Sequence, residues 1–317
     1  MKQFFALAVI ALSFLACGNG NAQNKQAASG QQTFIQLGNG LQMPQFGIGT
    51  FGLPSNEVAK NSVLTALKLG YRHIDTAHSY NDERGVGEGI KESGVPREEI
   101  WLTSKLWPSD YNDGKTLEHI DEMLERLQVD YVDLLYIHQP IGNYVEAWKA
   151  MEKAVELGKV RTLGISNFDL TDEGFQTMVE QMTIKPAILQ IECHPYAQRL
   201  QMREKAARYG LAVECWFPLG GQMSQKQLLN DPVIKAIGEA HGKTAAQTII
   251  RWHIQEGLSV IPGSSNPAHI AENLDVFDFS LTDAEMEQIR ALNKEQRYFN
   301  MPLEALQQFV NGRNLEN

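Results

Sequence analysis

The chain has 317 residues, of which 43% are hydrophobic and 21% are charged, which is the composition of a globular protein. Its length fits one large α/β barrel or two ordinary domains. The formal net charge is −10 and the chain contains no run of basic residues, so we expect neither a nucleic acid nor an anionic membrane surface as a partner. The three cysteines, at positions 17, 193 and 215, form no CxxC pattern or zinc-ligand spacing, so we expect no bound metal.

Residues 1–17 differ in kind from the rest of the chain. They contain one lysine and an apolar run, Phe4 to Ala16, that is too short to span a bilayer as a mature helix. The letters FLAC at the end of this run resemble the lipobox of bacterial lipoproteins and predict a lipoprotein-type signal peptide, with Cys17 as the lipidated residue. Cleavage after Ala22 and a buried N-terminal helix are the alternatives. We therefore expect an exported bacterial protein on the periplasmic side, held at the membrane only through Cys17.

The remaining chain predicts a flexible polar tether at 18–32 and one folded domain at 33–317. FIQLGNGLQM, at 34–43, predicts a β-hairpin that turns at Gly38-Asn39-Gly40. Eight short apolar runs follow, separated by amphipathic segments, at 46–49, 73–75, 100–104, 133–137, 161–166, 187–191, 211–216 and 259–261. Strands that alternate with helices predict a parallel sheet, and eight such units close into a (β/α)8 barrel. A doubly wound open sheet is the alternative, but the first strand is not followed by the Gly-rich fingerprint of that fold.

Titratable side chains stand at the ends of neighbouring strands, where such barrels carry their active sites. Asp75, Lys105 and His138 end the second, third and fourth runs, and Tyr80 follows Asp75 by five residues. Because an ammonium group stabilises phenolate, we expect Lys105, paired with Asp75, to lower the pKa of Tyr80 from about 10 toward neutrality. Tyr80 could then protonate a developing alkoxide while His138 orients the same oxygen. The hydride must come from a cofactor, because no side chain can supply one.

These residues and the sequences around them, including GYRHIDTAHSYNDE, WLTSKLW, LLYIH, GISNF and QIECHPY, resemble those of the aldo-keto reductase family. The resemblance covers about residues 33 to 300 and looks closest to the prokaryotic members related to 2,5-diketo-gluconate reductase. It implies a TIM barrel whose bottom is closed by the N-terminal hairpin. It also implies that NADPH or NADH reduces an aldehyde or ketone, with Asp75, Tyr80, Lys105 and His138 as the catalytic residues and Tyr80 as the proton donor.

The resemblance also implies which residues hold the cofactor. The matching positions are Ser166, Asn167 and Gln190 for the nicotinamide carboxamide, Trp216 for stacking on the ring, Leu219 and Gly220 for the pyrophosphate, and Glu272 and Asn273 for adenine.

The cofactor preference depends on the segment IPGSSNPAHIAEN after the eighth run. In NADPH-specific relatives, a lysine and an arginine in this segment clamp the 2′-phosphate. Here the two places hold Gly263 and His269, and only Ser264, Ser265 and a helix N-terminus could hold a phosphate. The loss of one charge-assisted hydrogen bond should weaken phosphate binding by about tenfold or more. We therefore expect use of both NADPH and NADH, with a weakened preference for NADPH.

Aromatic residues predict an apolar-walled pocket for a small-molecule carbonyl substrate that His138 orients. Phe51, Trp107 and Trp216 contribute to it, together with Tyr298 and Phe299 of the C-terminal tail. We expect a monomer, and the sequence does not separate an aldehyde reductase from a sugar or keto-acid reductase. Two other classes stay open: a cofactor-binding module without turnover, and a phosphate-binding barrel isomerase or lyase that uses PGSS after the eighth strand.

Overall fold

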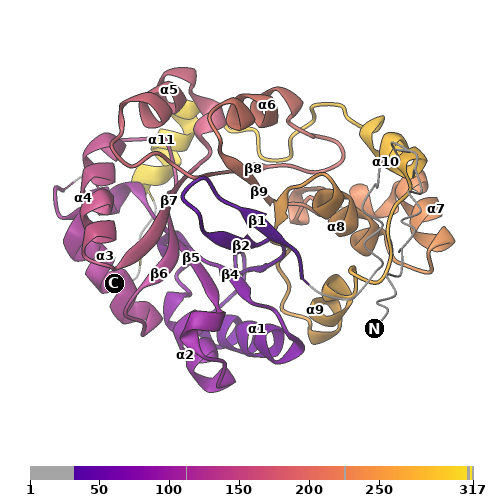
Figure 1. Ribbon diagram of the computed structural model, residues 1–317, viewed down its shortest axis with the longest axis horizontal. Helices are drawn as coiled ribbons and strands as arrows, with labels where there is room; N and C mark the ends of the chain where they lie inside the picture. Colours follow the sequence, from indigo (N-terminus) through magenta and orange to yellow (C-terminus); the bar gives the residue numbers. More distant parts are fainter. Residues whose placement is uncertain (1–31, 112, 225, 313–314, 316–317) are drawn as a thin grey trace, which may run out of the picture.

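The computed structural model describes residues 32–111, 113–224, 226–312 and 315. A parallel eight-stranded sheet forms the centre of the molecule, with its strands side by side in chain order (Figure 1). The strands are β3 (Ile48–Gly49), β4 (His73–Asp75), β5 (Trp101–Leu106), β6 (Val132–Ile137), β7 (Val160–Ser166), β8 (Ile188–Glu192), β9 (Ala212–Trp216) and β10 (Ser259–Val260). The two edges of the sheet meet through parallel bridges, Phe46 with Val260 and Gly49 with Gly263. This closure confirms the predicted (β/α)8 barrel.

Helices surround the barrel and connect its strands (Figure 1). They are α1 (Asn56–Leu69), α2 (Glu83–Ser93), α3 (Thr116–Leu127), α4 (Tyr144–Glu156), α5 (Asp172–Gln181), α6 (Leu200–Arg208), α7 (Pro232–Ala240), α8 (Ala245–Gln255), α9 (Pro267–Leu274), α10 (Asp283–Arg290) and α11 (Leu303–Gly312). Local signals in the sequence explain their ends. The Ser55 side chain accepts a hydrogen bond from the backbone N–H of Val58 at the start of α1, and Gly70, with φ 110°, ends that helix.

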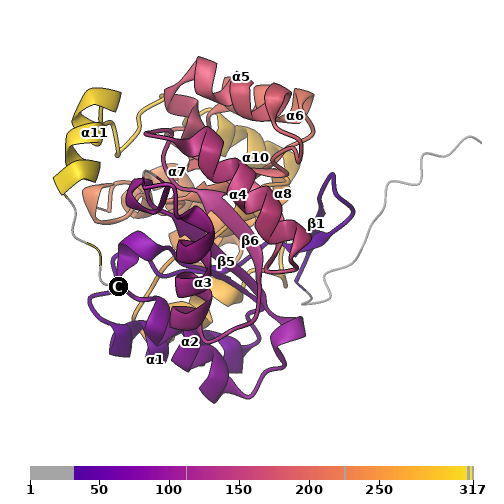
Figure 2. The same cartoon turned by 90° about the vertical axis from the view of Figure 1, so that its left-hand side faces the viewer.

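The N-terminal hairpin, made of β1 (Phe34–Gln36) and β2 (Gln42–Pro44), covers the bottom of the barrel. Leu37 and Met43 pack in one cluster with Trp101, the first residue of β5. Asn39, in the turn, donates a hydrogen bond from Nδ2 to Oγ1 of Thr162 at 2.6 Å. Figure 2 shows the hairpin on the side of the barrel opposite α11. The prediction that the hairpin closes the barrel bottom is therefore confirmed.

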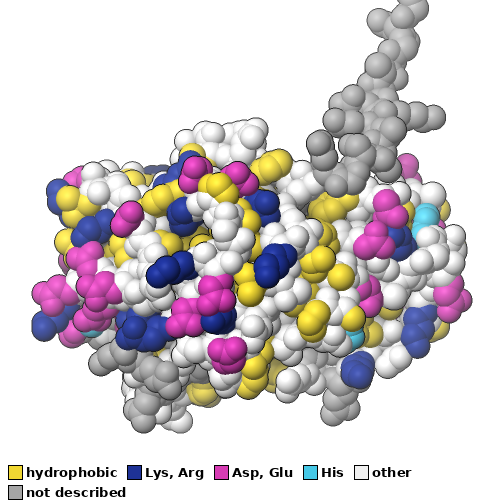
Figure 3. Space-filling view, turned by 90° about the horizontal axis from the view of Figure 1, so that it is seen from below, with side chains coloured by type: hydrophobic (Ala, Val, Ile, Leu, Met, Phe, Trp, Pro, Cys, Tyr) yellow, Lys and Arg dark blue, Asp and Glu magenta, His cyan; other side chains and the backbone are white. Residues whose placement is uncertain are grey.

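The predicted signal peptide and almost all of the predicted tether fall in residues 1–31, which lie outside the described residues. Gln32 is described and donates a hydrogen bond from Nε2 to the carbonyl oxygen of Phe46 at 2.5 Å. Within the described ranges, no helix combines the length and apolar character needed to cross a bilayer. On the face of the molecule in Figure 3, acidic and basic side chains are intermixed.

Candidate active site

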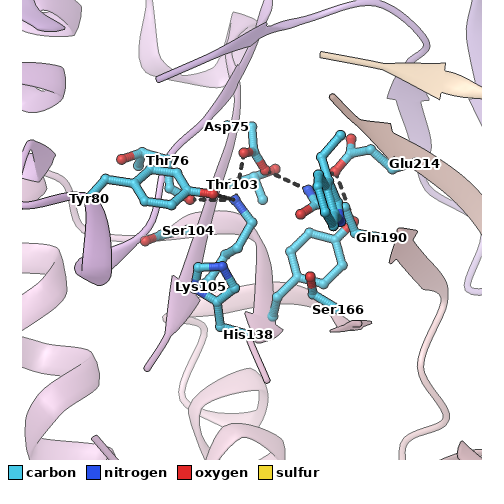
Figure 4. A network of polar contacts seen from close by, with 12 residues as sticks. Asp75, Thr76, Tyr80, Thr103, Ser104, Lys105, His138, Ser166, Gln190 and Glu214 are labelled. Carbon is cyan, nitrogen blue, oxygen red and sulfur yellow. Dashed lines mark hydrogen bonds and ion pairs between the residues drawn. The ribbon is translucent and has the colours of Figure 1, made fainter. Parts of the chain in front are cut away.

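The four predicted catalytic side chains come together at the C-terminal ends of β4, β5 and β6 (Figure 4). Lys105 lies at the centre of the group. Its Nζ atom is 2.5 Å from Oδ1 of Asp75, 2.9 Å from the carbonyl oxygen of Thr76 and 3.2 Å from Oη of Tyr80. The ammonium group has three hydrogens, so each has an acceptor. Lys105 is fully buried, so these three acceptors fix the position of its ammonium group.

The electrostatics of this group correct one prediction. Burial raises the pKa of Tyr80 to about 12, because desolvation of a phenolate outweighs the lowering effect of Lys105. The carboxylate of Asp75, which is paired with the ammonium, adds a smaller upward shift to the pKa of Tyr80. Burial alone would lower the pKa of Lys105, but Asp75 and Tyr80 shift it upward overall, so Lys105 stays charged. The expected fall of the Tyr80 pKa toward neutrality is wrong.

His138 follows β6 directly and lies between two aromatic rings. Its ring centroid is 5.7 Å from that of Tyr80 and 5.0 Å from that of Trp107. Oγ of Ser79 lies 3.3 Å from Nδ1 of His138, and Nδ2 of Asn167 donates to its carbonyl oxygen at 3.1 Å. Ser79 was not predicted from the sequence, although its position just before Tyr80 could have suggested it. These contacts hold the imidazole beside the Tyr80 hydroxyl.

A cavity of about 240 Å³ opens above these side chains. The predicted residues that line it are Phe51, Asp75, Tyr80, Trp107, His138, Ser166, Asn167, Gln190, Trp216, Leu219, Gly263 and Phe299. Lys105 lies beneath the floor rather than in the lining. The predicted residues that the structure does not bring into the lining are Gly220, Ser264, Ser265, His269, Glu272, Asn273 and Tyr298.

The segment after β10 explains why several predicted cofactor residues lie outside the cavity. Ser264 accepts a hydrogen bond from the N–H of Asn266, which in turn caps α9, so this stretch runs along the outside of the barrel. Glu272 is engaged elsewhere, because its Oε1 accepts a hydrogen bond from Oγ1 of Thr244 at 2.6 Å. Gly263 has a steric role: a Cβ at this position would lie 2.7 Å from the carbonyl oxygen of Gly49, where the barrel closes.

The C-terminal tail forms one wall of the cavity, as predicted, but only one of the two predicted residues takes part. Phe299 lines the cavity, and α11 adds Leu306 and Phe309, which were not predicted because no strand fixes the position of that helix. Tyr298 is not part of the wall, since its ring packs on His194 with the centroids 4.7 Å apart. The tail is held by the buried carboxylate of Glu192, which accepts hydrogen bonds from the N–H groups of Tyr298 and Phe299 at 2.6 and 3.2 Å.

The lining can accommodate a nicotinamide ring. The indole of Trp216 presents an aromatic surface to the cavity and is held by a hydrogen bond from Nε1 to Oδ1 of Asn167 at 3.1 Å. Ser166, the last residue of β7, and Gln190, its partner in β8, also line the cavity, so a hydroxyl and an amide face the same space as the indole. A flat aromatic surface next to polar groups suits a planar heterocycle that carries a carboxamide.

Another cluster contains residue types that can bind metals, although their sequence spacing did not suggest one. One potential ligand atom from each of Cys193, Cys215 and His253 lies within 4.8 Å of the others, and all three residues are buried. However, both ring nitrogens of His253 already contact carbonyl oxygens, those of Ile249 at 2.8 Å and Cys193 at 3.0 Å. We therefore assign this ring a packing role between α8 and the barrel.

Comparisons with known proteins agree with this fold. The model of the aldo/keto reductase family matches residues 43–294. Glyoxal reductase of Bacillus subtilis is 43% identical over 86% of this chain and 97% of its own length, and methylglyoxal reductase DkgA of Escherichia coli O157:H7 is 39% identical over 84% and 95%. A crystal structure of a Bombyx mori aldo-keto reductase in complex with NADP matches with a TM-score of 0.79 and 33% identity, over 86% of this chain and 96% of that one.

The chain belongs to the aldo/keto reductase family. It is an oxidoreductase, and the two other classes left open by the sequence, a module without turnover and a phosphate-binding isomerase or lyase, are set aside.

Proposed function

We propose that this enzyme reduces small, uncharged aldehydes and ketones with NADPH or NADH, and that Tyr80 donates the proton. The observation that carries this proposal is the Tyr80 hydroxyl, which lines the cavity and lies 3.2 Å from the buried Lys105 ammonium. A phenol in this position can protonate an oxygen that gains negative charge, and the ammonium stabilises the phenolate that remains.

The raised pKa of Tyr80 suits a proton donor. With a pKa of about 12, the phenol keeps its proton at neutral pH and is ready to give it up only when a stronger base forms next to it. His138 lies beside Tyr80 and can orient the carbonyl oxygen. When bound, a nicotinamide cofactor supplies the hydride. We assign Ser166, Asn167, Gln190 and Trp216 to its nicotinamide end.

The composition of the cavity wall favours uncharged substrates. Aromatic side chains form much of it, and the described lining includes no lysine or arginine. A substrate carboxylate would lose water there without gaining a cation, which is costly. Two relatives are named for glyoxal and methylglyoxal reduction, and both compounds are small and uncharged. We therefore propose small 2-oxoaldehydes of this kind as substrates, in preference to keto acids.

We also propose that the enzyme uses both cofactors, with a weakened preference for NADPH. The position where NADPH-specific relatives have a lysine is Gly263, and His269 stands exposed on α9 in place of an arginine. One relative of known structure was solved in complex with NADP, so we express the preference of this enzyme relative to NADP(H). A preference for NADPH above about a hundredfold would contradict dual use, because it would require strong charge-assisted contacts to the 2′-phosphate.

The composition of residues 1–17 supports the proposal that the protein is exported and anchored through a lipid on Cys17. Cell fractionation and mass spectrometry of the mature N-terminus test it. We expect a membrane-associated chain that begins with modified Cys17, and release from the membrane in the variant Cys17→Ser. Recovery of an unprocessed cytosolic chain that begins at Met1 would contradict the proposal.

A substrate panel tests the proposed reaction. Glyoxal, methylglyoxal, benzaldehyde and a keto acid are each assayed with NADPH and with NADH, following the absorbance of the reduced nicotinamide. We expect turnover of the three aldehydes with both cofactors. For the keto acid we expect kcat/KM to be reduced by about tenfold or more, because its charge would be buried without a partner. Tyr80→Phe is the control for background oxidation. No turnover of any aldehyde with either cofactor would overturn the proposal.

A further inference from the structure

A second polar cluster lies deeper in the barrel, below the residues of the proposed reaction. Its centre is Glu214 of β9, which is fully buried. Oε2 of Glu214 accepts hydrogen bonds from the Tyr136 hydroxyl at 3.0 Å and from Nε2 of Gln190 at 2.6 Å. Its Oε1 atom accepts a hydrogen bond from Oγ of Ser259 at 3.0 Å. The proposed reaction gives Glu214 no role, yet three strands of the barrel supply it with partners.

Gln190 links this carboxyl group to the active site (Figure 4). Besides Glu214, its Nε2 atom donates to Oδ2 of Asp75 at 2.9 Å, while Oδ1 of the same carboxylate accepts from Lys105. An amide nitrogen carries two hydrogens, and both are used by the two carboxyl groups. The orientation of the amide is thereby fixed, and its oxygen remains for the cavity that Gln190 lines.

His73, which lies next to Glu214, indicates that one proton lies between the two side chains. Nδ1 of His73 is 3.0 Å from the carbonyl oxygen of Pro44, which can only accept, so Nδ1 carries a hydrogen. Nε2 of the same ring lies 3.4 Å from Oε1 of Glu214 and 3.5 Å from the hydroxyl oxygen of Thr103, which can donate to it. In a neutral ring Nε2 is an acceptor, and it would face a second acceptor if Glu214 were ionised. One proton between Nε2 and Oε1 removes this repulsion.

The surrounding charges decide which of the two groups holds that proton. His73 and Asp75 approach Glu214 from β4, Lys105 from β5 and Tyr136 from β6. The Lys105 ammonium is already paired with Asp75 at 2.5 Å, so a proton on His73 would create a second ion pair with no exposure to water. A proton on Glu214 leaves both groups neutral. Burial favours the same outcome, because it lowers the pKa of His73 to about 4 and raises the pKa of Glu214.

We propose that Glu214 is a positioning residue that holds a proton shared with His73 and fixes the Gln190 amide so that the amide oxygen faces the bound cofactor. The part about the cofactor rests on the proposed function, whereas the location of the proton does not.

Infrared spectroscopy at pH 8 tests the location of the proton, because a protonated carboxyl group absorbs apart from carboxylates and peptide carbonyls. We expect a carboxyl band in the wild-type enzyme that is lost in Glu214→Gln. Asp82→Asn is the matched control, since burial raises the pKa of Asp82 to about 7 and its carboxyl lies outside this cluster. The band should persist in that variant. If no band depends on Glu214, the proposal is wrong.

Two substitutions at Glu214 test the positioning role. Glu214→Gln keeps an acceptor for Gln190 and Tyr136 and offers an N–H to His73, so we expect kcat, its pH profile and the cofactor Kd to stay within about threefold of wild type. Glu214→Leu has a similar size but leaves these partners unpaired. We expect the Kd for reduced cofactor, measured by quenching of tryptophan fluorescence, to rise by about tenfold or more. Equal damage from both substitutions would show that an ionised carboxylate is needed, which would overturn the proposal.

The two proposals fail in different ways. A chain that shows the Glu214 band but reduces no carbonyl compound would refute the proposed function and leave the location of the proton standing. Normal reduction without such a band would refute the proton on Glu214 and leave the proposed function standing.

Discussion

The floor and the rim of the cavity are built in different ways. At the floor and below it, Asp75, Lys105 and Glu214 lie on strands and are almost completely buried, and each is held by several hydrogen bonds. At the rim, Phe51 and Phe309 are 54% and 43% exposed and belong to a loop and to the last helix. The strands therefore hold the side chains to which we assign the chemistry, while the rim consists of parts that can change without disturbing the barrel.

The largest effect is expected from Tyr80→Phe. The substitution removes the proposed proton donor but keeps a ring that packs against Phe51, so we expect kcat to fall by about 10² to 10⁴ while cofactor Kd and stability change little. Pre-steady-state kinetics and fluorescence titration measure the two quantities. Because the pKa of Tyr80 is about 12, wild-type turnover should show no alkaline loss from this group below about pH 10. Near-normal turnover in the variant would reject the assignment.

Lys105→Met tests how strongly the floor depends on charge pairing. It leaves Asp75 buried without its cation, and breaking such a pair typically costs about 3 to 5 kcal/mol. We expect a loss of that size in the free energy of unfolding, measured with urea at pH 7, together with loss of turnover. The double variant Asp75→Asn with Lys105→Met removes both charges and should recover most of the stability but not the activity. A stable single variant would show that the pair is not essential to the floor.

Asp82 tests the surroundings of the floor through the pH dependence of stability, because its Oδ1 accepts a hydrogen bond from Thr76, whose carbonyl oxygen holds Lys105. Burial raises its pKa from 3.8 to about 7, so the folded state favours the protonated form. The resulting stability is fully present below pH 4 and is lost as the pH rises to about 7. We expect Asp82→Asn to be more stable than wild type at pH 8, by up to about 4 kcal/mol, with a much smaller difference at pH 4. Urea unfolding at both pH values measures this. A difference that does not depend on pH would contradict the expectation.

Glu192→Gln tests the attachment of the rim. The carboxylate of Glu192 accepts hydrogen bonds from the backbone N–H groups of Tyr298 and Phe299 and from Nε of the Arg297 side chain. Weaker acceptance by a neutral amide should loosen the wall that Phe299 forms. We expect KM to rise several-fold with little change in kcat, and a stability loss of about 1 to 3 kcal/mol. Glu287→Gln, which removes only an exposed ion pair with Arg290, is the control. A fall in kcat without a change in KM would show that Glu192 affects the reaction rather than substrate binding, which would contradict this expectation.

The smallest effect on the folded protein is expected from His269→Arg, which alters only the exposed outer rim and should leave stability unchanged. Position 269 can accept a longer side chain, whereas a lysine at Gly263 would collide with Gly49. We expect kcat/KM for NADPH to rise by about tenfold, from a new charge-assisted hydrogen bond to the 2′-phosphate, with the value for NADH unchanged. Parallel kinetics with both cofactors measure it. An equal gain with NADH would show that the arginine does not contact the phosphate.

The sequence predicts the floor better than the rim, for physical reasons. Buried parallel strands leave short apolar runs in the sequence, and their carboxyl ends lie at one side of a barrel, so the meeting of Asp75, Lys105 and His138 follows from chain order. The sequence does not predict the pKa of Tyr80, because that pKa depends on the balance between burial and Asp75, which raise it, and Lys105, which lowers it. The role of α11 does not follow either, since no strand fixes where a helix after the barrel must pack.

The position of the hairpin has a practical consequence for handling the enzyme. The chain enters the barrel at its bottom, on the side opposite α11, and α11 forms part of the cavity wall (Figure 2). A linker fused ahead of Thr33 would therefore immobilise the enzyme on a bead or an electrode with the mouth of the cavity facing the solution. A fusion after Gly312 would instead place foreign protein beside Leu306 and Phe309, where it would compete with substrate for access.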